Sequence, residues 1–115
     1  MPNNMPQPME RGQNRYYDIS YGLASAAVTT GVTIITTTGG NYHGASIIAG
    51  ATAQAVVKIY DNASTTSGNL MDVFTVTQGQ NAWIDRYIPV VAKNGMTISL
   101  TGTGSEGAIF YGPKG

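Results

Sequence analysis

Apolar and polar side chains alternate with a period of two residues along much of the chain, most clearly in Met-Thr-Ile-Ser-Leu-Thr at residues 96–101. In an extended strand this period places the apolar residues on one face, so the pattern is typical of a half-buried β-strand. Similar segments recur at a spacing of roughly 8 to 12 residues, with no helical segment between them. We predict strands at residues 17–23, 30–38, 42–49, 53–60, 70–77, 82–91, 96–101 and 108–111.

Strands without helices must bury their apolar faces against a second sheet, which predicts an all-β fold built as a two-sheet β-sandwich. About eight strands suit a jelly roll, in which each of the two sheets holds four strands. The chain has 115 residues, of which 42% are hydrophobic, and this is enough for one domain with one core. We place the sandwich domain at residues 15–115.

The alternation also predicts which side chains share a face. In residues 70–77, Leu70 and Phe74 fall on one face and Val73 on the other. Asp72 and Asp85 fall at outward positions, where each carboxylate meets water.

Turn-forming and strand-breaking residues predict how the strands end. Asp61 begins a polar loop, where its side chain can cap backbone N–H groups. Lys93-Asn94-Gly95 is a hairpin signal. Pro89 has no N–H to donate, so the end of its strand is expected at a sheet edge or a bulge.

The first 14 residues are predicted to form an extended arm, because prolines fix φ and bias the preceding residues towards extended conformations. One interpretation is a strap that orders on a neighbouring protein, and the alternative is a disordered terminus. The candidate partner-binding residues of the arm and its junction are Pro2, Asn3, Asn4, Met5, Pro6, Pro8, Met9, Arg11 and Arg15.

Charged residues make up only 10% of the chain, and its formal net charge is zero. Nucleic-acid binders usually present a clustered basic face, whereas the six basic residues here are scattered, which disfavours DNA or RNA as a partner. A surface with so few charges gains little from self-repulsion and tends to associate. We therefore expect a homo-oligomer.

Residues with catalytic or metal-binding chemistry are few and dispersed. The chain has no cysteine and a single histidine, His43, so a structural zinc site is not expected. His43 is interpreted as a part-exposed strand residue, and the carboxylates each have an ordinary structural explanation. We predict no enzyme activity, no catalytic residues, no metal and no cofactor.

No apolar stretch approaches the roughly 20 residues that cross a bilayer, and the N-terminus has no apolar core of the kind a secretion signal needs. We therefore expect no membrane partner and synthesis in a cytoplasm.

Four aromatic residues are candidate surface contacts. Tyrosine and tryptophan have high strand propensity and pack at sheet edges and subunit contacts. The favoured interpretation is that the four residues have this structural role. The alternative is a sugar platform of flat rings. The candidates are Tyr16, Tyr42, Trp83 and Tyr87.

Two segments resemble a known group of proteins. Residues 57–64, Val-Lys-Ile-Tyr-Asp-Asn-Ala-Ser, are followed by Ser67-Gly68 and Leu70, and residues 93–98, Lys-Asn-Gly-Met-Thr-Ile, lead to Leu100-Thr101-Gly102. Together they resemble small β-sandwich virion proteins of tailed bacteriophages. In those proteins a strand ending in Tyr-Asp enters a Ser/Thr/Gly loop, and a late Asn-Gly turn opens the penultimate strand. The resemblance covers about residues 56–111.

The resemblance implies a structural protein of the virion, such as a capsid decoration (cement) protein that stabilises the head by binding the major capsid protein. Such a protein is made in the host cytoplasm, is located in the virion and is expected here as a trimer strapped to the capsid by its arm. Neck, tail and fibre proteins share the same features. The alternative is therefore one of these components, or a carbohydrate-binding module, that recognises a host surface glycan through tyrosine and tryptophan side chains.

Overall fold

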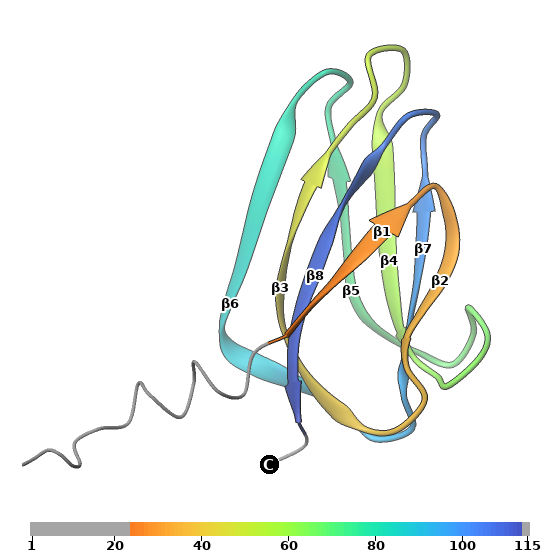
Figure 1. The fold of residues 1–115 in the computed structure, drawn as a ribbon, viewed down its shortest axis with the longest axis vertical. Helices are drawn as coiled ribbons and strands as arrows, with labels where there is room; N and C mark the ends of the chain where they lie inside the picture. Colours follow the sequence, from red (N-terminus) through yellow and green to blue (C-terminus); the bar gives the residue numbers. More distant parts are fainter. Residues whose placement is uncertain (1–23, 114–115) are drawn as a thin grey trace, which may run out of the picture.

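The computed structural model describes residues 24–113, which fold into two antiparallel four-stranded sheets packed face to face (Figure 1). The strands are β1 (Ala24–Thr29), β2 (Gly31–Thr36), β3 (Gly40–Ile48), β4 (Ala55–Asp61), β5 (Asn69–Val76), β6 (Asn81–Ala92), β7 (Met96–Thr101) and β8 (Glu106–Pro113). The first sheet has the order β1-β8-β3-β6 and the second has the order β2-β7-β4-β5. This is a jelly roll, as the strand pattern predicts.

Most connections carry the chain from one sheet to the other. Only β4 and β5 are both consecutive and hydrogen-bonded to each other within the described residues. The prediction of a hairpin at Lys93-Asn94-Gly95 is therefore wrong, because β6 and β7 belong to different sheets. The tight turn is present, but it passes over the end of the sandwich instead of folding a strand back on its neighbour.

The core lies between the sheets and is built from the inward faces of the strands. In β4, Val57 and Ile59 are fully buried while Lys58 between them is exposed. In β7, Ile98 and Leu100 are likewise fully buried. The period-two alternation in these strands is thus a correct guide to the buried face.

Every predicted strand that lies within residues 24–113 overlaps an observed strand. β1 was not predicted, because Ala24-Ser25-Ala26-Ala27 contains only small side chains and gives no alternation of large and polar residues. The predicted strand at 17–23, the arm at 1–14 and the candidates Arg15 and Tyr16 lie outside the described residues. No helix in residues 24–113 has the length and apolar character needed to cross a membrane.

An irregularity in β5 reverses the predicted face of Leu70. Ile59 pairs with Asp72 and Tyr60 pairs with Leu70, so Met71 is an extra residue that bulges out of the ladder. Leu70, beyond the bulge, is exposed as a result instead of sharing the face of Phe74. Asp72 is buried, contrary to the outward position predicted for it, because it keeps the alternation of Phe74 and Val76, which face inward. The single extra residue shifts the alternation by one position.

Candidate functional site

The edge strand β6 arches away from its neighbour at one point. Gly44 of β3 pairs with Asp85, but Tyr42 pairs with Val90, so His43 alone faces four residues of β6. We call these four residues, 86–89, the arch. They include Pro89, which has no N–H to leave unpaired. The prediction that Pro89 lies at an edge or a bulge is confirmed on both counts.

Gly44 permits the close approach of β3 and β6 beside this arch. Its φ is +141°, and a Cβ atom built on it would lie 2.0 Å from the carbonyl oxygen of Ile84. Gly44 pairs with Asp85 on one side and with Phe110 of β8 on the other. Because glycine places no side chain between Asp85 and Phe110, the outer surface of the first sheet is hollowed there.

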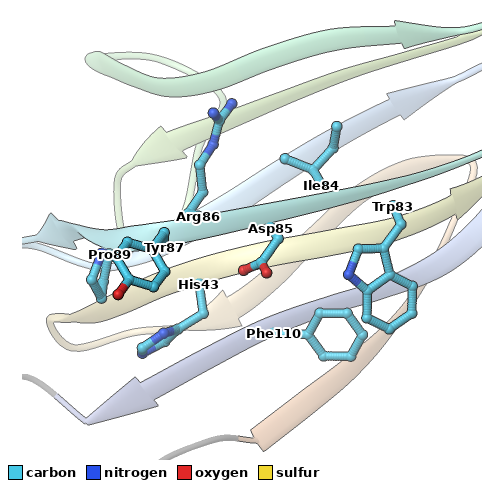
Figure 2. Close-up of a pocket in the computed structure, with 8 residues that line it drawn as sticks. All are labelled: His43, Trp83, Ile84, Asp85, Arg86, Tyr87, Pro89 and Phe110. Atoms are coloured by element: carbon cyan, nitrogen blue, oxygen red, sulfur yellow. The ribbon is translucent and has the colours of Figure 1, made fainter.

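Figure 2 shows this hollow, which has a volume of about 560 Å³. Its walls are aromatic at both ends, with Trp83 and Phe110 at one end and Tyr87 with Pro89 at the other. His43 and Asp85 lie between them. We call this feature the hollow; its lining residues are His43, Trp83, Ile84, Asp85, Arg86, Tyr87, Pro89 and Phe110.

The aromatic rings of the hollow are largely open to solvent. Trp83 is 70% exposed and Tyr87 is 94% exposed. The Trp83 and Phe110 ring centroids are 5.5 Å apart with an angle of 34° between the ring planes, so the Phe110 ring supports one side of the indole. Rings that remain this exposed would lose water-contacting surface if a ligand or partner covered them.

The arch is fixed to the second sheet by Arg86. Its side chain points away from Asp85 and His43, towards the second sheet (Figure 2). There its Nε donates to Oδ2 of Asp72 at 3.1 Å and its Nη2 donates to the other carboxylate oxygen. This ion pair links β6 to β5 across the edge of the sandwich.

Tyr42 is the third member of this hydrogen-bonded group. Its hydroxyl donates to Oδ2 of Asp72 at 2.8 Å, and the N–H of Val73 donates to Oδ1 at 2.9 Å. Burial, followed by the hydrogen bond to Asp72, raises the pKa of Tyr42 well above its usual range, so the hydroxyl stays protonated. The hydrogen bond from Arg86 to Asp72 raises the pKa of the guanidinium. Asp72 thus has a structural role at an inward position, whereas an outward position was predicted for it.

The two segments that carry the phage resemblance meet at one corner of the sandwich. The carboxylate of Asp61 accepts hydrogen bonds from the N–H groups of Lys93 at 3.0 Å and of Asn94 at 2.8 Å. The Thr97 hydroxyl donates to the carbonyl oxygen of Asn62 at 2.8 Å. The capping role predicted for Asp61 is confirmed, although the capped turn is the distant β6–β7 connection.

The outer surface of the second sheet carries a second exposed apolar surface. Strand pairing places Val32, Ser99, Lys58 and Val73 in one row across the sheet, and Ile34, Thr97, Tyr60 and Leu70 in the next. Lys58 is the only charged residue in these two rows. We call this surface the apolar face; its exposed large residues are Val32, Ile34, Leu70 and Val73.

The structure shows which of the predicted surface-contact residues are exposed and which are buried. Trp83 and Tyr87 both line the hollow, at its opposite ends, whereas Tyr42 is fully buried and is not a surface contact. The bulge in β3 turns Tyr42 inward beneath the arch. The arm residues and Tyr16 lie outside the described residues, so their proposed contacts stay predictions.

Sequence reasoning missed the contribution of His43, Asp85 and Phe110 to the hollow. A glycine in the middle of a strand and a proline near the end of another were the available signals, since both mark bulges or close backbone approach. In residues 24–113 no group of three or more His, Asp or Glu side chains is arranged to hold a metal ion.

No protein-family model, no curated protein and no solved structure matches this chain.

Proposed function

We propose that this protein is a non-catalytic structural component of a bacteriophage particle, a decoration protein that binds the major capsid protein. The observation that carries the proposal is the apolar face, where Val32 is 59% exposed and Val73 is 50% exposed on either side of the single charge of Lys58. Several exposed large apolar side chains with few charges among them are characteristic of protein–protein contact regions.

The phage part of the proposal rests on the resemblance of residues 56–111. The geometry supports the β-sandwich fold that this resemblance implies. Asp61, Asn94 and Thr97 form the hydrogen-bonded corner, so the shared residues have a clear structural reason to occur together. Residues 1–14 are proposed to act as a strap on the major capsid protein.

In this proposal the protein is a homotrimer. The sheet edges β1 and β2 lie at one side of the sandwich, and β5 and β6 lie at the other. A contact between two different edges can repeat around a threefold axis and close into a ring. Each subunit then hides its unpaired strand edges from further association.

The proposal is tested by mixing the protein with phage heads that lack it and measuring co-sedimentation. Replacing Val32 and Val73 together by Glu places two charges on the apolar face, and we expect binding to weaken by about tenfold or more. The matched control is Thr103→Glu, an exposed residue in the connection between β7 and β8, which should bind like the parent.

Far-UV circular dichroism establishes that each variant keeps its sheet structure. Deletion of residues 1–14 tests the strap in the same assay, and light scattering of the free protein tests the trimer. Equal binding by the Val32→Glu, Val73→Glu variant and the parent would show that the apolar face is not the capsid contact.

A further inference from the structure

The hollow contains exposed aromatic rings, which form an apolar platform, and polar side chains that lie next to these rings. Trp83 and Tyr87 expose most of their surface, and Phe110 supports the indole from the side. An aromatic face carries partial negative charge and attracts C–H groups that carry partial positive charge. A ligand with one flat C–H face would therefore stack on this platform.

Asp85 and His43 lie next to the platform and supply directional hydrogen bonding (Figure 2). An ionised carboxylate accepts hydrogen bonds through both oxygens, and a neutral imidazole has one donor and one acceptor. Together these groups can bind several hydroxyls on the edge of a ligand whose face is stacked. A purely apolar ligand would leave the carboxylate covered without a hydrogen bond, which is unfavourable.

The charge that faces the hollow is negative. Arg86 belongs to the lining, but its guanidinium points to the second sheet and is paired with Asp72. Asp85 is thus the charged group turned towards a ligand, and it repels carboxylates and phosphates. The volume of about 560 Å³ falls within the range of small-molecule sites.

We propose that the hollow binds a neutral sugar ring of a glycan. The ring stacks on Trp83 and Phe110, and its hydroxyls donate to Asp85 and exchange hydrogen bonds with His43. Acidic sugars are rejected by the Asp85 carboxylate. The proposal is independent of the capsid contact, because the hollow and the apolar face lie on the outer surfaces of different sheets.

Trp83 is the only tryptophan of the chain, so its fluorescence reports directly on the hollow. The experiment titrates the full-length protein with glucose, galactose, mannose and N-acetylglucosamine. Galacturonic acid, N-acetylneuraminic acid and choline are titrated in parallel. We expect at least one neutral sugar to change the fluorescence saturably, with a dissociation constant on the order of millimolar, and no response to the two acids.

Variants locate the binding. Asp85→Asn and Phe110→Ala keep the fluorescent residue and should weaken binding by about tenfold each. Trp83→Ala, followed by calorimetry, should abolish it. Lys58→Ala on the apolar face is the matched control and should bind like the parent. Circular dichroism confirms that each variant is folded.

Three results would overturn the proposal. One is the absence of a response to all four neutral sugars, and another is sugar binding that survives Trp83→Ala in calorimetry. The third is a saturable response to choline alone, which would identify a cation site on the aromatic rings instead. If the Val32→Glu, Val73→Glu variant loses capsid binding but still binds sugar, the capsid contact and the sugar site are different surfaces.

Discussion

At the scale of single residues, Gly44 is the position on which the hollow most depends. Replacing it by Ala would bring the new Cβ against the Ile84 carbonyl oxygen and force a side chain into a φ of +141°. We expect the free energy of unfolding to fall by about 3 kcal/mol or more, measured by denaturant titration.

Gly31 offers a matched control for this substitution. Its φ is +115°, but a Cβ there would meet no atom within 4 Å. Gly31→Ala should therefore cost only the backbone strain, about 1–2 kcal/mol. Equal losses in the two variants would show that the close approach of Ile84 contributes nothing.

At the scale of elements, Asp61 joins the end of β4 to the β6–β7 turn. Asp61→Ala removes the acceptor for the Lys93 and Asn94 N–H groups, and we expect a loss of about 2 kcal/mol at pH 7. Burial acts to raise the pKa of this carboxyl, but the backbone hydrogen bonds from Asn94 and Lys93 outweigh it and lower the pKa.

The sign of the pH dependence follows from that lowered pKa. As pH falls below about 4, the unfolded chain takes up a proton at Asp61 before the folded protein does, so stability falls with pH. Denaturant titrations should show the full difference between parent and Asp61→Ala above this pH and a shrinking difference below it. Asp85→Ala, an exposed aspartate change, is the control and should alter stability little. A difference that is constant with pH would mean that the carboxylate charge is not involved.

The sequence predicts strands well where one face is large and apolar, as in β4 and β7. Ile59 and Ile98 pair directly across these strands and are both fully buried, so local alternation and tertiary packing agree. The prediction of the buried face fails for Leu70, where an extra residue breaks the alternation. The side chain of Met71 in β5 does not mark it as a bulge. The inward direction of Asp72 follows the alternation of Phe74 and Val76, but its partner Arg86, which is 14 positions away in the chain, cannot be found from that alternation.

The hollow is harder to predict than the strands, because its walls come from three strands brought together by the fold. Trp83 and Tyr87 were identified by residue type alone. His43 and Phe110 join them only through the pairing of β3 with β6 and β8. Single-sequence patterns contain no information on this pairing.

At the scale of the whole molecule, the jelly-roll topology makes most contacts distant in sequence. Of the six strand pairings found in residues 24–113, only β4 with β5 joins consecutive strands. Closing long loops before contacts form slows folding, so we expect refolding in milliseconds to seconds. Stopped-flow circular dichroism measures this rate. Refolding in microseconds would show that local structure, and not strand pairing, limits the reaction.

The place of β8 between β1 and β3 has a consequence for synthesis. β8 leaves the ribosome after the other seven strands of the described sandwich, yet it fills the gap in the middle of the first sheet. Until Glu106–Pro113 emerges, β1 and β3 have no neighbour in that gap, and their backbone groups are open to other nascent chains on the same messenger RNA. A chain that stops short of residue 106 would therefore be a substrate for chaperones and proteases.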